Sequence, residues 1–185
     1  TQVVHYIAPH WDHVPEMLRG LRAFDARTKG LASVVRAAVL SFGFVYIHPM
    51  VDGNGRLSRF LINDTLRRDG VLPDPFILPV SATIISSSAS RRGYDQVLEL
   101  FSKPLMMRYA DQYRFGDEVQ GADGITYNLE FDGYADASFA WRYPDLTDHV
   151  EYLGAVIEDT LRKEMPKEAN FLRQLRSARE AVKSL

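Results

Sequence analysis

The sequence predicts a mainly α protein with a small β-hairpin in its C-terminal third, and two patterns carry this prediction. Apolar residues recur at helical spacing in several segments before residue 110 and again after residue 144. Between these segments, residues 125–131 alternate apolar and polar side chains, which is the periodicity of a strand. Of the 185 residues, 46% are hydrophobic, which is enough for one well-packed domain, or one domain and a small extension.

Two helices are predicted in the first quarter of the chain. Asp12 is a suitable N-cap and Pro15 a suitable first-turn residue for a helix whose apolar stripe is formed by Met17, Leu18, Leu21 and Phe24. Residues 31–47 are apolar on almost every side, which is typical of a helix buried at the centre of a domain. A buried strand is the alternative, and the length of the segment disfavours it.

A third helix is predicted over residues 55–68, because these residues are good helix formers and because Gly70 and Pro73 supply a stop signal. Residues 81–92 are rich in serine, and their structure stays open at this point. A further helix is predicted over residues 94–109, with its apolar side chains facing the core.

The predicted hairpin lies after this helix. Asp132-Gly133 is typical of a tight turn, so residues 125–131 and 134–141 are predicted to pair as two antiparallel strands. The alternation in the first of these segments continues up to the turn, which supports the pairing.

Two helices are predicted to end the chain. One follows Pro144 and stops at Pro166, which cannot continue a regular helix, and the last carries Phe171, Leu172, Leu175 and Val182. We therefore divide the chain into a core, residues 1–115, and a C-terminal extension, residues 116–185, which packs on the core or contacts a partner.

The composition disfavours several classes of function. The chain has no cysteine, so it has neither disulfides nor thiolate metal sites, and this fits a reducing compartment. A formal net charge of −2 gives no overall attraction for nucleic acid. No apolar stretch reaches membrane-spanning length, and no secretion signal opens the chain. We expect a cytoplasmic protein that binds neither membranes nor nucleic acid directly.

The most informative stretch joins the second and third predicted helices and reads His48-Pro49-Met50-Val51-Asp52-Gly53-Asn54-Gly55-Arg56-Leu57-Ser58-Arg59. Two glycines around an asparagine allow a sharp turn that a ligand can approach closely. Because this turn opens a helix, several N–H groups stay free at the positive end of the helix dipole, where phosphate binds. Gly53, Asn54 and Gly55 are therefore a predicted phosphate cradle.

Four side chains around this cradle fit a reaction on a polyphosphate. Arg56 and Arg59 lie three positions apart, so a helix presents both guanidinium groups on one face. Asp52 precedes the cradle, where a carboxylate can hold Mg²⁺ together with phosphate oxygens. The unperturbed pKa of a histidine side chain lies near neutrality, and His48 precedes a proline, so we expect a general base at the end of its helix.

Each of these residues also has a structural interpretation when it is considered alone. Asp-Gly and Asn-Gly are ordinary turn dipeptides, a histidine after an apolar helix is usually a core residue, and arginines on helices are usually solvated. The functional interpretation depends on their occurrence together in a fixed order.

In this order the residues resemble the signature of the Fic family, His-Pro-Phe-x-(Asp/Glu)-Gly-Asn-Gly-Arg-x-x-Arg, and the match fails only at Met50. Fic proteins are largely helical enzymes that mostly transfer AMP from ATP to a Ser, Thr or Tyr hydroxyl of a target protein. The resemblance implies the same helical bundle and the same reaction here. Methionine is apolar and flexible, so Met50 can fill the space of the family's aromatic residue with less rigidity.

The resemblance also implies a role for each residue of the motif. His48 would deprotonate the target hydroxyl, Asp52 would hold Mg²⁺, and the α- and β-phosphates of ATP would bind in an anion hole formed by Gly53, Asn54 and Gly55. The β-phosphate region would contact Arg56, and the γ-phosphate would contact Arg59.

The resemblance extends over residues 1–115. The segment Tyr6-Ile7-Ala8-Pro9 is similar to one that follows the family's flap hairpin, so the end of a flap strand that docks the target is implied at Thr1, Gln2, Val3 and Val4. By the same resemblance the chain starts within this hairpin. Tyr94 begins a segment similar to the border of the family's adenine pocket and is a candidate for stacking on the base, although a tyrosine at helical spacing also fits a core position.

The mode of inhibition and the donor stay open. Many Fic proteins are restrained by a glutamate of a Ser/Thr-x-x-x-Glu-Gly/Asn helix that pairs with the second arginine, here Arg59. Thr160 and Glu164 have this spacing, but Met165 follows them, so we expect an inhibitory segment or partner elsewhere, and a solvated helix face here. The alternatives to an ATP-dependent adenylyltransferase are another diphosphate-containing donor, removal of AMP, and a non-catalytic nucleotide-binding or peptide-docking module. An oligomer also stays open.

Overall fold

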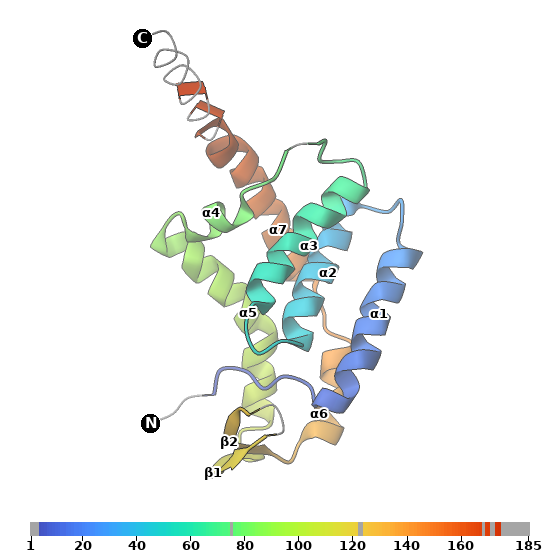
Figure 1. Ribbon diagram of the computed structural model, residues 1–185, viewed down its shortest axis with the longest axis vertical. Helices are drawn as coiled ribbons and strands as arrows, with labels where there is room; N and C mark the ends of the chain where they lie inside the picture. Colours follow the sequence, from blue (N-terminus) through green and yellow to red (C-terminus); the bar gives the residue numbers. More distant parts are fainter. Residues whose placement is uncertain (1–3, 75, 122–123, 168, 171–172, 175–185) are drawn as a thin grey trace.

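Helices form most of the fold, as predicted. The computed structural model describes residues 4–74, 76–121, 124–167, 169–170 and 173–174. Along the chain its elements are a 3₁₀ turn η1 (Trp11–His13), α1 (Val14–Arg27), α2 (Ser33–Ile47), α3 (Asn54–Arg68), α4 (Val80–Ile85), α5 (Ser88–Arg108), β1 (Tyr113–Gln120), β2 (Thr126–Phe131), α6 (Tyr134–Arg142), α7 (Thr147–Asp159) and a π-helical turn η2 (Thr160–Glu164). Figure 1 shows their arrangement.

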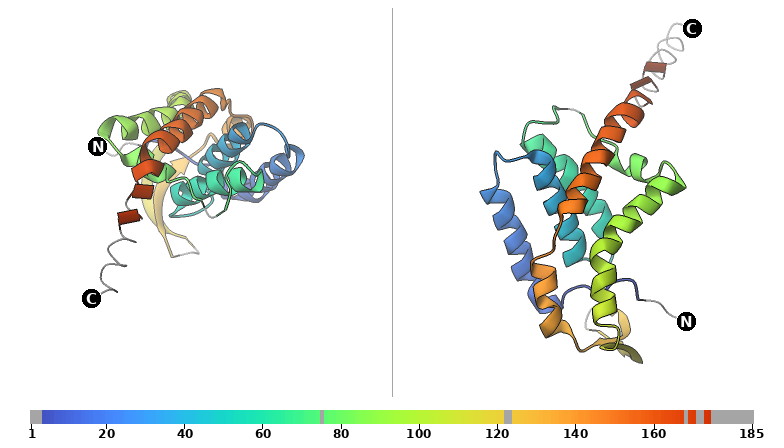
Figure 2. Two further views of the ribbon diagram at one scale, coloured as in Figure 1. Left: turned by 90° about the horizontal axis from the view of Figure 1, so that it is seen from above. Right: turned by 180° about the vertical axis from the view of Figure 1, so that it is seen from behind.

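Helix α2 is the central element of the fold. It packs against α1 and α3 on two sides, and α7 lies behind it (Figures 1 and 2). Its side chains Ala37, Ala38, Phe42 and Tyr46 are buried in one apolar core with residues of α3, α5 and α7. The apolar run that predicted a central buried helix is therefore confirmed, and the helix starts two residues later than the run.

Helices α1 and α3 agree with the prediction except at one end. Helix α3 covers the predicted residues 55–68 and begins one residue earlier, at Asn54. Helix α1 begins at Val14, with His13 as its N-cap, so the predicted N-cap Asp12 is wrong. Asp12 lies instead in η1, where its N–H bonds to the ring of His10, and this extra turn moves the helix start along the chain.

The hairpin is present, but its second strand was predicted on the wrong side. Strand β2 contains the alternating residues, and it pairs antiparallel with β1, which precedes it. Residues 134–141, predicted as a strand, lie in helix α6. The physical reason is packing, because Ala137 and Trp141 are four residues apart and are both buried in a second apolar cluster, as a helix allows.

Helical structure continues past Pro166, which was predicted to end it. The turn η2 precedes this proline, and the N–H of Met165 bonds to the carbonyl of Thr160, five residues back. This wider turn places the proline where no regular i−4 bond is required of it. The four apolar residues on which the predicted last helix depends, Phe171, Leu172, Leu175 and Val182, lie outside the described residues.

The proposed division of the chain stays a prediction. The boundary after residue 115 falls within β1, and Leu146, Leu153 and Val156 from the predicted extension share the apolar core with α2. None of the helices in the described ranges is long and apolar enough to cross a membrane.

Candidate active site

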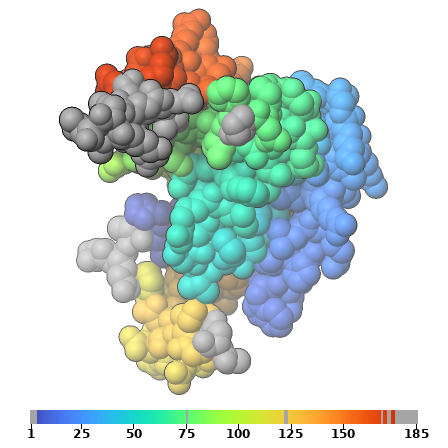
Figure 3. All heavy atoms as spheres, turned by 45° about the horizontal axis from the view of Figure 1, so that its top comes forward, coloured from blue at the N-terminus to red at the C-terminus, as the bar shows by residue number. Residues whose placement is uncertain are grey.

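The motif forms the connection between α2 and α3, at the end of the molecule where the hairpin lies (Figures 1 and 3). His48 is the C-cap of α2 in the left-handed conformation, with φ 51° and ψ 52°, and its N–H bonds to the carbonyl of Phe44 at 3.0 Å. Among the described residues no other non-glycine residue has a positive φ. The prediction that His48 ends its helix is confirmed.

The ring of His48 is held in the form that a base requires. Nδ1 lies 3.1 Å from the carbonyl oxygen of Val45, and a carbonyl only accepts, so Nδ1 carries the proton of the neutral ring. Nε2 then has a free lone pair, and the side chain is exposed. The ring of Tyr6 packs beside it, with the two ring centroids 6.4 Å apart.

The turn that opens α3 leaves three backbone donors free. Gly53 caps the helix with φ 92°, a conformation that side chains with a Cβ rarely adopt. The first N–H to bond within this turn is that of Leu57, which donates to the carbonyl of Gly53 at 2.9 Å. The N–H groups of Asn54, Gly55 and Arg56 precede it and have no acceptor four residues back, so they form the open anion site expected at a helix N-terminus.

Both motif arginines lie over this turn. A Cβ placed on Gly53 would lie 3.5 Å from Nη2 of Arg56, and one on Gly55 would lie 3.2 Å from Nη1 of Arg59. The two guanidinium groups therefore flank the free N–H groups, as the spacing predicted. Together they concentrate positive charge where a diphosphate would bind.

The carboxylate of Asp52 is positioned beside the same turn. One oxygen accepts the N–H of Gly53 at 2.6 Å, and the other pairs with Nη2 of Arg56 at 2.8 Å. The side chains of Asp52 and Arg56 are 86% and 74% exposed, so the pair contributes at most about 1 kcal/mol and a ligand can displace it.

The side chain of Asn54 has a function that the sequence did not reveal. It is buried, and it bonds twice to the backbone of Met50, accepting its N–H at 3.0 Å and donating to its carbonyl at 2.5 Å. These two bonds close the loop before α3. Asn54 can therefore offer a phosphate its backbone N–H, while its side-chain amide holds the loop.

Ser81, which sequence reasoning missed, contacts the motif from α4. Its hydroxyl oxygen accepts a hydrogen bond from Nε of Arg59 at 2.7 Å. Tyr94, on α5, is partly buried against the core, and its ring centroid lies 6.3 Å from that of Tyr152. Burial raises the pKa of Tyr94, and the nearby charge of Arg59 opposes this rise. Its stacking on a base stays a prediction.

Comparison with known proteins identifies this segment. Residues 1–66 match the model of the Fic/DOC family. The matched segment, 66 of the 185 residues, is similar to Fic/DOC proteins. It contains the whole motif and ends within α3. None of the solved structures matches the chain significantly.

Curated relatives carry the name protein adenylyltransferase. The chain is 37% identical over 71 residues to protein adenylyltransferase fic-1 of Caenorhabditis elegans, which is 37% of this chain and 14% of that protein. It is 41% identical over 56 residues to fic-1 of Caenorhabditis briggsae, covering 30% and 11%. It is 45% identical over 53 residues to protein adenylyltransferase Fic of Drosophila mojavensis, covering 29% and 10%. The matches thus span 10–14% of these three relatives' lengths.

Other features of the Fic resemblance are only partly within the described residues. Of the predicted flap strand, Thr1, Gln2 and Val3 lie outside them, and Val4 is not in a strand. Glu164, in the near match to an inhibitory motif, pairs with Lys167 at 2.8 Å, and its side chain is only 16% exposed. Thr160 is fully buried and bonds to Thr83 of α4, so the expected solvated helix face is wrong for these two residues.

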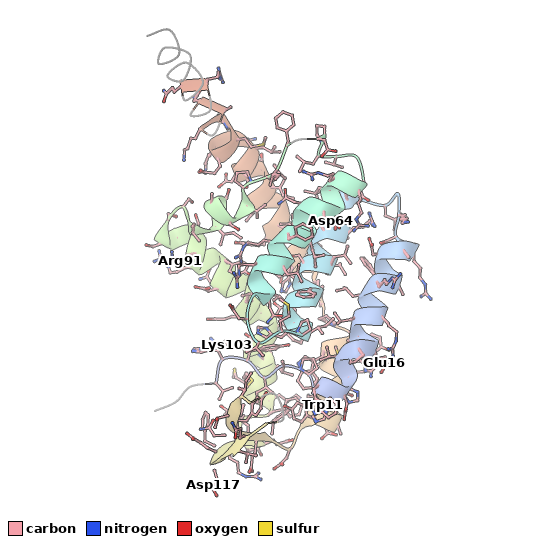
Figure 4. All side chains as sticks on the ribbon, in the orientation of Figure 1. Trp11, Glu16, Asp64, Arg91, Lys103 and Asp117 are labelled. Atoms are coloured by element: carbon pink, nitrogen blue, oxygen red, sulfur yellow. The ribbon has the colours of Figure 1, made fainter. Side chains whose placement is uncertain are left out.

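A cavity of about 730 Å³ lies apart from the Fic motif. It is bounded by α1, α2, α6 and α7, and its lining includes Tyr46 and Ile47 but no residue from His48 to Arg59. Glu16, labelled on α1 in Figure 4, bonds across it to Arg142 of α6. The candidate site is thus the open surface of the motif and not the interior of this cavity.

Proposed function

We propose that the protein is a protein adenylyltransferase that transfers AMP from ATP to a Ser, Thr or Tyr hydroxyl of a target protein. The observation that carries this proposal is a histidine with a free Nε2 lone pair in the same loop as an open, arginine-flanked anion site. A base and a polyphosphate cradle are the two components that nucleotidyl transfer to a hydroxyl requires. The names of the curated relatives support the same reaction.

In the proposed reaction the target hydroxyl oxygen attacks the α-phosphorus of ATP, and its proton passes to Nε2 of His48. The bond from the α-phosphorus to the oxygen that bridges to the β-phosphate breaks, and pyrophosphate leaves. The N–H groups of Asn54, Gly55 and Arg56 would stabilise the phosphate oxygens during this step. Arg56 and Arg59 would bind the β- and γ-phosphates, which holds the leaving group in line.

Asp52 is the residue that would hold Mg²⁺. The described residues contain no group of three or more acidic, histidine or cysteine side chains that could bind a metal by themselves. An exposed single carboxylate beside an anion site fits Mg²⁺ nevertheless, because this ion is often bound by one carboxylate together with substrate phosphates. Bound there, the ion would neutralise phosphate charge.

The proposal includes two expected contacts with other proteins. The flap segment, Thr1 to Val4, would dock an extended piece of the target by strand addition. An inhibitory segment or partner would act on Arg59, whose guanidinium lies at the surface of the motif and can accept a carboxylate in place of the γ-phosphate.

The test is transfer by the wild-type chain and by its His48→Ala variant. Each is incubated with Mg²⁺, ATP and a lysate that supplies targets, and modified proteins are detected by intact mass. We expect an AMP adduct that falls by about 10²- to 10⁴-fold without His48. Equal adduct formation by both proteins would contradict the role of His48. Thermal unfolding of the variant serves as the control for folding.

Two alternatives have their own outcomes in this experiment. The cradle contacts phosphates, and no described contact at the loop selects a base, so donors such as other nucleotides and phosphocholine carriers are tested in parallel. An adduct from one of them, or loss of AMP from a modified target, assigns the site to a related reaction. Nucleotide binding without any adduct indicates a non-catalytic module.

A further inference from the structure

His149 is a buried histidine that lies outside the motif and outside the segment matched by the family model. It is on α7, and its side chain is 1% exposed. Its Nε2 lies 2.6 Å from the hydroxyl of Tyr46, on the last turn of α2. Its Nδ1 is buried and has no partner among the described atoms, so the Tyr46 hydroxyl is the polar contact that fixes the ring.

Tyr46 joins four parts of the chain at this point. Its hydroxyl also lies 3.4 Å from the carbonyl oxygen of Leu98 on α5, and its ring packs on Phe101, with centroids 4.5 Å apart. Its own carbonyl accepts the hydroxyl of Tyr6 at 2.5 Å. The last turn of α2 is therefore tied to α5, to α7 and to the N-terminal segment.

His48 follows this turn directly and is connected to it in two ways. Along the chain, Tyr46 lies two residues before His48, and the helix carbonyl that fixes the imidazole belongs to the neighbouring Val45. Through space, the ring of Tyr6 contacts both Tyr46 and His48, with centroid separations of 6.0 Å and 6.4 Å. A shift of Tyr46 would therefore move both the backbone and the ring that orient His48.

We propose that His149 is a positioning residue, which holds Tyr46 and through it keeps the His48 ring in the geometry for proton transfer. This inference rests on the proposed function, and it gives the C-terminal part of the chain a role at the Fic motif that acts through Tyr46. Helix α7 lies against the back of α2, opposite α3, which is the arrangement that such a role requires (Figure 2).

Three variants test the pair. His149→Leu removes the contact, and Tyr46→Phe removes the hydroxyl of Tyr46 while keeping its ring packing. His149→Gln replaces the imidazole with an amide that can still bond to the Tyr46 hydroxyl. We expect kcat for transfer to fall on the order of 10- to 100-fold in the first two, with KM for ATP unchanged, and to recover largely in His149→Gln. Tyr152→Phe, which removes a phenol hydroxyl from the same face of α7, is the matched control and should leave kcat unchanged.

A second readout does not depend on activity. Nitrogen-15 NMR of the histidine rings reports which ring nitrogen of His48 carries the proton. We expect the Nδ1–H form in the wild type and in His149→Gln, and a mixture of both forms in Tyr46→Phe. If His149→Leu does not fold, Tyr46→Phe decides the case.

The inference is overturned if folded Tyr46→Phe keeps both the wild-type ring signals of His48 and the wild-type kcat. Unchanged ring signals together with a raised KM for ATP would also overturn it, because they would indicate an effect on nucleotide binding. If even the wild type transfers nothing, the proposed function fails, and the ring signals alone then decide whether His149 positions His48.

Discussion

Two clusters of arginine and aspartate lie at opposite ends of the antiparallel pair α2 and α3, and they differ in burial. At the motif end, Asp52 and Arg56 are 86% and 74% exposed. At the other end the side chain of Arg36 is 1% exposed, and it pairs with Asp25 at 2.6 Å and with Asp69, whose side chains are 23% and 11% exposed. Nε of Arg36 also donates to the hydroxyl of Thr28.

The difference shows how one chemistry has two uses in the same helix pair. A buried guanidinium whose three nitrogens all donate hydrogen bonds cannot exchange partners without a large cost, so the Arg36 cluster fixes α1, α2 and α3 together. The exposed pair of Asp52 and Arg56 is held weakly and lies beside free N–H groups. A phosphate can therefore replace Asp52 as the partner of Arg56, and a cation can replace Arg56 as the partner of Asp52. The first cluster stabilises the fold, and the second is suited to binding.

The largest effect is expected at the buried end. Arg36→Met should lower the free energy of unfolding by about 3–5 kcal/mol, because it leaves the Asp69 carboxylate without its arginine partner and the Asp25 carboxylate with Arg68 alone. Arg56→Met should change it by less than about 1 kcal/mol. Urea unfolding of both variants measures the contrast, and equal losses would break the comparison.

At the exposed end we expect a substitution to lower the rate of transfer strongly and the stability only slightly. Asp52→Asn should lower the rate of AMP transfer by about 10²- to 10³-fold while leaving stability nearly unchanged. Initial rates at increasing Mg²⁺ concentration are the measurement. Asp64→Asn is the matched control, because Asp64 is also an aspartate of the α3 region paired to an arginine four residues away (Figure 4). A similar loss of rate in that control would argue against a specific role of Asp52.

Backbone strain gives a third contrast. Gly53→Ala should lower stability by roughly 1–2 kcal/mol, because φ at this position is 92° and a Cβ would lie 3.4 Å from Cε of Met50. Gly154→Ala, on α7, should raise stability by about 0.5–1 kcal/mol, because its Cβ would meet nothing within 4 Å. Thermal unfolding of the two variants checks the opposite signs.

A pH dependence should come from a buried group and not from the exposed pair. Burial lowers the pKa of His149, although Asp148 and Asp145 oppose the shift. Between the unfolded-state pKa near about 6.5 and the lower folded-state pKa, only the unfolded chain binds the proton. The contribution of His149 is therefore complete above about pH 6.5 and is lost as the pH falls, by at most about 1.4 kcal/mol per pH unit.

Urea unfolding at about pH 7.5 and about pH 5.5 measures this slope, since histidine titrates in this interval. His149→Gln should flatten it. A slope that is identical in the wild type and the variant would assign the dependence to other groups.

The smallest effect is expected at Ser81. Ser81→Ala removes the acceptor for Nε of Arg59, which should raise KM for ATP about 3- to 10-fold, the equivalent of one modest hydrogen bond. The inhibition constant of ADP, measured in competition with ATP, gives a check, because ADP lacks the γ-phosphate expected to contact Arg59. Equal changes for ATP and ADP would place the effect elsewhere in the loop.

The parts of the fold that could be predicted are those in which one local pattern determines the structure. The apolar run before His48 leaves almost no polar face, and its length favours a helix over a strand, so the sequence predicts a buried central helix. Gly53 of the motif adopts a positive φ, and the predicted turn depends on this freedom. In both segments the local structure is determined by residues that are close together in the sequence.

The errors lie where distant contacts decide. Asp132-Gly133 has the local chemistry of a hairpin turn, but burial of Ala137 and Trp141 selects a helix after it. Pro166 stops a regular helix, and only the wider turn at η2 removes that constraint. Ser81 reaches Arg59 across 22 positions of the chain, and no local pattern marks such a contact.

The two hydrogen bonds between the Asn54 side chain and the Met50 backbone determine which positions of such loops can vary in sequence. Both bonds use backbone atoms of residue 50, so any side chain that fits there leaves the loop closed. A change at residue 54 has no such freedom, since only asparagine offers a donor and an acceptor at this reach. A sequence pattern that tolerates variation at the third motif position but requires asparagine at the seventh would therefore recognise related loops that a pattern demanding an aromatic ring overlooks.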